Sequence, residues 1–468
     1  MPSMAYTIFK LPIGYRLYDR EKNKIISVSY EEYIALKNII QGKPSEEDQK
    51  LLCGFQEKGF CRESRLQEIE HPATGKIQSI VEKGLNQIVL QVTQNCNLRC
   101  SYCAYSGSYY NRKHSNKRMS KETALRAVDF FMEHSSEIED ATIGFYGGEP
   151  LLEIDLIREV ISYVEENYPE RKVRYNLTTN LTLLTKEILD FFVEKNVVIM
   201  ISIDGPKEIQ DRNRMFVSGT GSFSTVITKA EEIQKNSPDY FKQCMTNTVM
   251  SPGSDYEKVI DFLDNDRLFG QLTSLYSLVN DVDIKEELQY DDTYNQTVHK
   301  EIFKIYLAML GELEYSQVSR LMKTNVSAIF ETNQFLQMNG TANMRKSHPG
   351  GPCIPGSNRP FVDVEGFFYP CERIAENPAL QIGNLDEGYS LDRINRMLNI
   401  GKMTEEQCLN CWAFMYCGTC AANMTEHGIP SKKIRLKRCS GERTNIQNRL
   451  ANLEMMRYYG FDFMQGEE

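Results

Sequence analysis

Three cysteines within eight residues are the most distinctive chemical feature of the chain. Cys96, Cys100 and Cys103 are separated by three and two residues and directly follow an apolar stretch. Three thiolates this close on one loop can hold three irons of a [4Fe–4S] cluster, which leaves the fourth iron open to bind a small molecule. A structural zinc site needs four ligands, and neither a histidine nor a fourth cysteine lies close enough in the sequence to complete one. The spacing therefore indicates an iron–sulfur cluster with an open iron.

Seven more of the 13 cysteines lie in the last quarter of the chain. They form two groups, an early pair and a later run in which the spacings are two, five and two residues before a final single cysteine. Cysteine pairs separated by two residues are common zinc ligands, so two zinc ribbons are an alternative for this region taken alone. Only Cys53, Cys61 and Cys244 stand apart, and we expect them to behave as small buried hydrophobic residues.

The first cysteine motif, with the aromatic Tyr102 before its last cysteine, resembles the radical S-adenosylmethionine (SAM) superfamily. In that family the open iron chelates the amino and carboxylate groups of SAM. Two further segments occur in the family's order: Gly147-Gly148-Glu149-Pro150, and Ser202-Ile203-Asp204-Gly205-Pro206 with Arg214 downstream. The glycines let the backbone approach the ligand, the Glu lies near an ammonium, and the Arg pairs with a carboxylate. The resemblance thus implies SAM contacts by Tyr102, Gly147, Gly148, Glu149, Asn180, Ser202 and Arg214.

The C-terminal pattern resembles the SPASM domain, which carries two auxiliary [4Fe–4S] clusters in a subgroup of radical SAM enzymes. The usual last spacing of the run is three residues, whereas here it is two. Two cubane clusters need eight ligands and the region offers seven, so the resemblance predicts a second open iron. It implies three [4Fe–4S] clusters in total. The SPASM pattern assigns Cys408, Cys411, Cys417 and Cys439 to one auxiliary cluster, and Cys353, Cys371 and Cys420 to the other.

Alternating strands and helices are expected to position these motifs. Repeated strand–helix units predict an α/β fold with a parallel sheet, either doubly wound or a partial barrel. The resemblance implies a partial (β/α)6 barrel, and catalytic residues of barrels collect where strands end. Strands are expected at 87–93, 142–146, 173–178, 198–203, 245–250 and 272–278, and helices near 121–134, 154–167, 185–195, 222–236 and 256–268.

The sequence divides into five parts. Residues 1–61 show three short strand patterns and then two helical patterns, similar to a winged helix. This small separate module resembles the recognition element of maturases of ribosomally made peptides, which binds a leader peptide as an added strand; an ordinary accessory domain is the alternative. Residues 62–85 are expected to be a linker, 86–285 the barrel, 286–345 a helical bridge and 346–468 the Cys-rich SPASM domain. Little helical periodicity is expected after residue 339.

Composition narrows the class of protein. The 468 residues are 41% hydrophobic and 25% charged, which is typical of a globular protein and excludes a fibrous or disordered chain. No apolar run approaches the roughly 18 residues of a membrane helix, and no secretory signal is visible, so we expect a cytoplasmic protein without a membrane partner. The net charge of −10 argues against nucleic acid as the main partner.

The resemblance implies a peptide maturase. In such an enzyme a reduced cluster at the first motif cleaves SAM, and the resulting 5′-deoxyadenosyl radical removes a hydrogen from a leader-bearing precursor peptide. The favoured product is an intramolecular Cys thioether, and a flavodoxin- or ferredoxin-type protein would supply electrons.

Two alternatives stand beside this hypothesis. Anaerobic sulfatase maturases oxidise Ser or Cys to formylglycine, but they carry an Asp after the cysteine found here at position 371, and an eighth auxiliary cysteine. This chain has Glu372, a candidate catalytic base, and seven cysteines. A non-catalytic iron–sulfur or zinc scaffold protein is the other alternative, and it would not need the SAM-binding segments.

Overall fold

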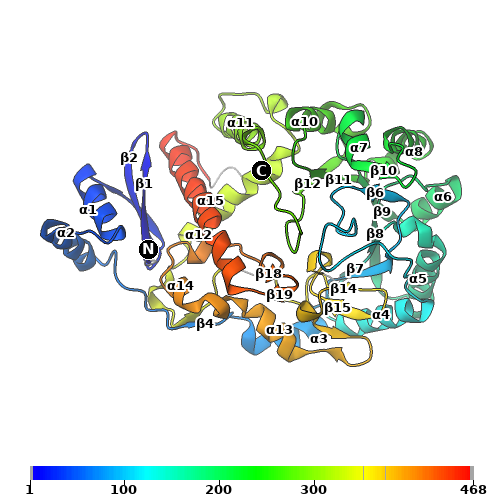
Figure 1. Cartoon of the computed structure of the whole chain (residues 1–468), viewed down its shortest axis with the longest axis horizontal. Coiled ribbons are helices and arrows are strands. Elements are labelled where there is room, and N and C mark those ends of the chain that lie inside the picture. The colour runs from blue at the N-terminus through cyan, green and yellow to red at the C-terminus, as the bar shows by residue number, and fades with distance from the viewer. Residues whose placement is uncertain (1–3, 351–352, 375, 464–468) are drawn as a thin grey trace.

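A curved, mixed sheet forms the centre of the computed structural model, which describes residues 4–350, 353–374 and 376–463 (Figure 1). Its ten strands have the order β12-β11-β9-β8-β7-β5-β14-β15-β16-β17. The first six pair in parallel and form an open barrel wall. These six strands are β5 (Gln87–Thr93), β7 (Asp140–Gly147), β8 (Lys172–Thr179), β9 (Val197–Ser202), β11 (Met245–Met250) and β12 (Thr273–Leu278).

Helices alternate with these strands and form an outer layer around the sheet (Figure 1). All six strands and five helices lie within three residues of their predicted positions, so the α/β prediction is confirmed. Period-2 and period-3.6 apolar patterns are strong here because each element buries one face in a large core. The helices are α4 (Lys121–His134), α5 (Ile154–Asn167), α6 (Lys186–Glu194), α7 (Lys207–Asn213), α8 (Phe223–Asn236), α9 (Pro238–Phe241) and α10 (Tyr256–Asn265).

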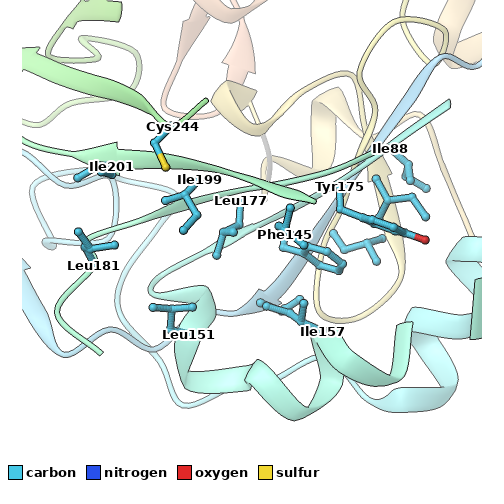
Figure 2. Close-up of a cluster of buried hydrophobic side chains, with 14 of the residues drawn as sticks. Ile88, Phe145, Leu151, Ile157, Tyr175, Leu177, Leu181, Ile199, Ile201 and Cys244 are labelled. Atoms are coloured by element: carbon cyan, nitrogen blue, oxygen red, sulfur yellow. The ribbon is translucent and has the colours of Figure 1, made fainter. Parts of the chain in front are cut away.

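A continuous apolar core joins the sheet to this helical layer. Figure 2 shows Phe145, Leu177 and Ile199 pointing from the strands toward Ile157 on α5. All four side chains are almost completely buried. Cys244 lies in the same core, as expected for a small hydrophobic residue.

The C-terminal region extends the sheet instead of forming a detached domain. Strand β14 (Phe361–Val362) pairs in parallel with β5, and the antiparallel strands β15 (Phe367–Tyr369), β16 (Gly383–Asn384) and β17 (Gly388–Tyr389) follow. These strands were not predicted, because two or three residues are too few to show a period. Their pairing places Cys371 directly beyond β15.

The N-terminal module contains the three strands and two helices that were predicted. Strands β1 (Tyr6–Leu11), β2 (Gly14–Asp19) and β3 (Lys24–Val28) form an antiparallel sheet, followed by α1 (Tyr30–Ile40) and α2 (Glu46–Glu57). Ser29 and Glu32 form the capping box that starts α1. Cys61 is buried here as expected, whereas the prediction of a buried Cys53 is wrong because its side chain is exposed on α2.

The module's sheet has two buried faces, which corrects the prediction of a separate module. One face packs on α1 and α2. The other carries Phe9 and Tyr18, which share a core with Tyr416 and with Ile446 of α15 (Lys432–Tyr458). The module is therefore part of the same packed body as the C-terminal cysteines.

Two other expectations need correction. Residues 62–85 are not a plain linker, because α3 (Ile77–Lys83) buries Ile77 and Val81 in the main core. The low periodicity expected after residue 339 is also wrong, because α15 has 27 residues. Its buried stripe is narrow, and its strongly polar surface conceals the helical period.

The remaining elements connect these parts. The segment 286–345 contains α11 (Asp292–Met309) and α12 (Ser327–Gln337), which agrees with its expected helical character. Among the described residues, no helix is both long and apolar enough to cross a membrane. The other short elements are β4 (Glu68–Ile69), β6 (Leu98–Cys100), β10 (Arg214–Phe216), β13 (Lys346–Ser347), α13 (Leu391–Leu398), α14 (Glu405–Leu409), β18 (Thr425–Glu426) and β19 (Ile429–Pro430).

A buried histidine in the C-terminal region predicts an acid-sensitive stability. Burial, Arg435 and His71 lower the pKa of His348 from 6.5 to about 4, and its Nε2 accepts a 2.9 Å hydrogen bond from the Gly401 amide. Between pH 6.5 and 4 the unfolded chain therefore binds a proton that the folded chain rejects. Acidification across this window is expected to remove about 3 kcal/mol of the free energy of unfolding.

The matched variant is His348→Gln, which keeps a hydrogen-bond acceptor but does not titrate. Denaturant unfolding of both proteins at several pH values measures the effect. The wild type should lose more stability than the variant between pH 6.5 and 4, and parallel pH profiles would contradict the assignment.

Candidate active site

The first cysteine motif lies on a loop that leaves the C-terminal end of β5. Strand β6 within this loop pairs antiparallel with β10, and Cys100 lies opposite Arg214. The loop then turns back, with the Cys103 amide donating to the Cys100 carbonyl over 3.1 Å. This pairing brings Arg214, which follows the Ser202–Pro206 segment, beside the cysteines, although about a hundred residues separate them in the sequence.

The three thiols of this loop lie close enough to repel one another electrostatically. Burial raises the pKa of Cys96 and of Cys100 to about 12, and neighbouring cysteines add to the rise. Two backbone amides point at the sulfurs: Leu98 N lies 3.3 Å from Cys96 Sγ and Tyr105 N lies 3.5 Å from Cys103 Sγ. Amide donors of this kind stabilise cluster-bound thiolates. Thiols this reluctant to ionise alone need the positive charge of bound iron to remain thiolates.

Gly147 and Gly148 are required by a close backbone approach at the end of β7. A Cβ on Gly147 would lie 2.1 Å from the Thr93 carbonyl oxygen, and one on Gly148 would lie 2.0 Å from that of Asn95. Gly147 also has a φ of 142°, which disfavours other residues. The Gly148 and Glu149 amides donate to the Thr93 and Asn95 carbonyls over 2.9 Å. The segment is thereby joined to the start of the cysteine loop.

Glu149 is buried and is held by donors from the protein itself. Its Oε1 accepts from the Thr179 hydroxyl (2.6 Å) and the Leu151 amide (3.0 Å), and its Oε2 accepts from the Asn180 amide (2.8 Å). Burial still raises its pKa. The Asn180 side chain donates to Asn97 Oδ1 on the cysteine loop over 2.9 Å. These two residues thus connect β7, β8 and the loop.

A charged group that the sequence analysis did not single out is centred on Asp204. The Arg214 Nε lies 3.0 Å from Asp204 Oδ1, and the Tyr102 hydroxyl donates to Asp204 Oδ2 over 2.6 Å. The Arg214 guanidinium also lies 5.5 Å from the Tyr102 ring centroid. Asp204 is fully buried and follows β9, two residues beyond the buried Ser202. Asp204 therefore fixes the orientation of two predicted SAM-contacting side chains.

A cavity of about 490 Å³ opens beside Tyr102. Ser101, Asn213 and Ser251 line it together with residues 284–289. Its volume lies within the range of small-molecule sites. Of the residues predicted to contact SAM, Tyr102 alone lines this cavity.

The seven C-terminal cysteines fall into the two groups that the SPASM pattern assigns. Cys353, Cys371 and Cys420 are electrostatic neighbours, as are Cys408, Cys411, Cys417 and Cys439. Cys244 lies in the barrel core and Cys61 in the module, so neither joins the three-cysteine group. We call these groups the three-cysteine site and the four-cysteine site.

Glu372 follows Cys371 and forms an ion pair with Arg359 at 3.1 Å. Its Oε2 is buried and has no hydrogen-bond partner among the described residues. Burial and the charge of Glu372 together raise the pKa of Tyr146 to about 12. A second carboxylate was missed: Glu376 Oε1 accepts from the Tyr105 hydroxyl and the Gln91 amide, each over 2.6 Å. Glu376 has a left-handed backbone (φ 61°), which no sequence motif indicates.

The residues present fit the implied iron–sulfur clusters. Within the described ranges, no three His, Cys, Asp or Glu side chains are placed to hold a single metal ion. A [4Fe–4S] cluster binds each cysteine on a different iron, so its ligands surround a volume and do not meet at one point. All ten predicted ligands are free cysteines, and nine of them are half-buried.

Comparison with known proteins identifies the barrel. Residues 90–265 match the model of the Radical SAM superfamily. A cysteine-type anaerobic sulfatase-maturating enzyme from Clostridium novyi (strain NT) is 34% identical over 160 residues, 34% of this chain and 42% of that protein. The radical SAM cyclopropyl synthase TigE from Paramaledivibacter caminithermalis is 27% identical over 261 residues, 52% of each protein. The chain thus spans about half the length of these curated relatives.

A solved structure shares the fold over a longer range. Native anSMEcpe with bound AdoMet superposes with a TM-score of 0.58 and covers 78% of this chain and 98% of its own. The two sequences are 20% identical, so this likeness concerns the fold.

Proposed function

We propose that this chain, whose residues 90–265 form a radical SAM domain, is a maturase that crosslinks a ribosomally made precursor peptide. A radical SAM domain uses a [4Fe–4S] cluster and SAM. When bound, these supply a 5′-deoxyadenosyl radical that can remove a hydrogen atom from a peptide carbon. The proposal assigns that cluster to Cys96, Cys100 and Cys103, with reduction by an external flavodoxin- or ferredoxin-type donor.

Residues near the first cysteine loop would hold SAM. Gly147 and Gly148 keep the end of β7 free of side chains, and Glu149 and Asn180 keep the loop attached to the barrel. Arg214, oriented by Asp204, would pair with the SAM carboxylate. The cavity beside Tyr102 is large enough to accept part of the nucleoside.

The observation that carries the crosslinking proposal is the three-cysteine site. Cys353, Cys371 and Cys420 leave one ligand position of a cubane cluster without a cysteine, and Cys61 and Cys244 lie in other cores. An iron with an open position is a soft Lewis acid that suits a thiolate. It would bind the substrate cysteine, keep it deprotonated, and hold its sulfur near the carbon that loses hydrogen. Glu372 beside this site is the candidate base for the thiol proton.

The N-terminal module would bind the leader of the precursor. Strand β3 is an edge of the module's three-stranded sheet, with β2 as its neighbour. An extended peptide can add to such an edge through main-chain hydrogen bonds. We assign the leader to the edge of β3, and the likeness of this module to a winged helix stays a prediction.

A second candidate is oxidation of a Cys or Ser to formylglycine. The likeness to the sulfatase-maturating enzyme of Clostridium novyi and the shared fold with anSMEcpe favour it. Glu372 would then replace the Asp that the sulfatase-maturase resemblance places after this cysteine. The two candidates differ in the fate of the substrate sulfur, because a thioether retains sulfur and formylglycine formed from Cys loses it.

Mass spectrometry of reacted peptides separates these functions. The enzyme is incubated anaerobically with SAM and a reductant, and with either a Cys-containing precursor encoded beside the gene or a sulfatase-motif peptide. We expect the precursor to lose two hydrogens and retain its sulfur, while the sulfatase peptide stays unchanged. Loss of sulfur from either peptide would favour the second candidate, and replacement of the precursor Cys by Ser is the control.

A further inference from the structure

One face of α15 presents two arginines to the four-cysteine site. Arg435, Cys439 and Arg443 follow one another at intervals of four residues, so their side chains lie along one stripe of the helix. The Cys439 thiol lies 3.7 Å from the Arg435 carbonyl oxygen. Both arginines therefore flank a predicted cluster ligand within one turn of helix.

Arg435 contacts this site through a threonine. Its side chain is 2% exposed, and its Nε donates to the Thr404 hydroxyl over 2.8 Å. The Thr404 oxygen lies 3.2 Å from Cys408 Sγ. Burial raises the pKa of Cys408, and the Arg435 charge opposes that rise. The guanidinium thus acts on the sulfur from within the protein, where solvent screens little.

Arg443 approaches the same site from the other side. Its Nε is buried and has no hydrogen-bond partner within the described structure. Burial would lower the pKa of Arg443, but the charges of Cys411, Cys439 and Cys408 raise it, as does a side-chain hydrogen bond with Cys411. A buried cationic nitrogen without a partner is costly unless a negative group lies nearby. The four thiolates of a bound cluster would supply that negative charge.

The N-terminal module adds a third arginine, Arg20, which holds the backbone of the segment that carries Cys411. The fully buried Arg20 donates from one Nη to the carbonyl oxygens of Leu409 (2.9 Å) and Cys411 (3.0 Å). Its other Nη lies 2.8 Å from Glu21 Oε1, so this carboxylate balances its charge. Arg20 therefore holds the backbone around Cys411 but adds little net charge.

The three-cysteine site has a different electrostatic environment. Its adjacent ionised pair is Glu372 and Arg359, whose charges cancel at 3.1 Å. Burial first and then Glu372 raise the pKa of Cys371 to about 12. The Glu372 carbonyl also accepts from Arg112 Nη2 over 2.8 Å, so this site has a cationic neighbour of its own. Arg435 and Arg443 add two positive charges beside the four-cysteine site, which has one thiolate more than the three-cysteine site.

We propose that Arg435 and Arg443 make a cluster at the four-cysteine site easier to reduce than it would be without them. This inference rests on the proposed function, since it requires a cluster at each site. Adding one electron to a cluster adds one negative charge, and nearby positive charges favour that form, most strongly in a buried setting. The arginines are tuning residues, and they need not touch the substrate.

An anaerobic redox titration of the holoenzyme with dithionite, followed by the EPR signals of reduced clusters, tests this. Arg443→Gln is expected to lower the equilibrium constant of one reduction step at least tenfold. For a one-electron couple this lowers the reduction potential of that step by about 59 mV. Arg443→Lys keeps the charge and should recover most of the shift. Arg457→Gln removes a positive charge about 21 Å farther along the same helix and should leave every step in place.

Two further variants assign the shifted step to a site. The reduction step that Arg443→Gln shifts should persist when Cys353 and Cys371 are both replaced by Ala. It should disappear when Cys408 and Cys411 are both replaced by Ala. The inference is overturned if Arg443→Gln moves no step, or moves the step that Cys353 and Cys371 support. A wild-type protein with far fewer than about twelve irons per chain would instead contradict the proposed function.

Discussion

Replacing Cys96, Cys100 and Cys103 together by Ala is expected to abolish the cleavage of SAM to 5′-deoxyadenosine. The iron content should fall from about twelve to about eight per chain, because the other two sites keep their ligands. The reason is geometric: among the cysteine-bearing segments that the structure describes, this loop is the one joined to the Gly147–Glu149 segment and to Arg214. Anaerobic iron analysis and chromatography of the SAM products measure both effects.

The matched control is Cys53→Ala, because Cys53 is exposed on α2. It should retain both the irons and the cleavage activity of the wild type. Wild-type amounts of 5′-deoxyadenosine from the triple variant would place the SAM site elsewhere.

Tyr18→Ala is expected to release iron from the C-terminal region although it lies in the N-terminal module. Tyr18 is fully buried, and its ring packs edge-on against Trp412 and Tyr416 at 6.3 and 5.9 Å between centroids. Both partners lie between Cys411 and Cys417. Removing a large buried aromatic side chain costs about 3–5 kcal/mol. We expect Tyr18→Ala to lower the free energy of unfolding by this amount and the iron content from about twelve to about eight per chain.

Tyr6→Ala provides the comparison within the same sheet. Tyr6 is also buried, but it faces α1 and α2 instead of α15. It should lower the free energy of unfolding by a similar amount while all irons remain bound. Equal iron contents in the two variants would show that the module does not support the four-cysteine site.

The sequence predicted the barrel well because its chemistry and its packing follow regular patterns. Strands such as 87–93 and 245–250 have the predicted bounds, since the first is a continuous run buried on both faces and the second alternates between buried and half-buried residues. The motifs that follow β5, β7 and β9 were also expected to lie together, because parallel strands bring their C-terminal ends to one edge of the sheet. The prediction failed for β14, which is too short to show a period, and for α15, whose buried stripe is narrow.

The contacts between distant segments could not be predicted from the sequence. Asp204 was quoted as part of a motif, but its contacts with Tyr102 and Arg214 depend on the pairing of β6 with β10. Glu376 reaches Tyr105 from a left-handed backbone position, for which no local pattern exists. The role of Arg20 likewise depends on a loop nearly four hundred residues away.

Transfer of deuterium from the peptide to 5′-deoxyadenosine shows whether this chain removes hydrogen from a precursor peptide. The precursor peptide, with its leader, is labelled with deuterium at its carbon-bound positions and incubated anaerobically with the enzyme, SAM and a reductant. We expect 5′-deoxyadenosine to gain deuterium in proportion to the amount of peptide that becomes modified. A modified peptide with unlabelled 5′-deoxyadenosine, or labelled product without any change in the peptide, would contradict it.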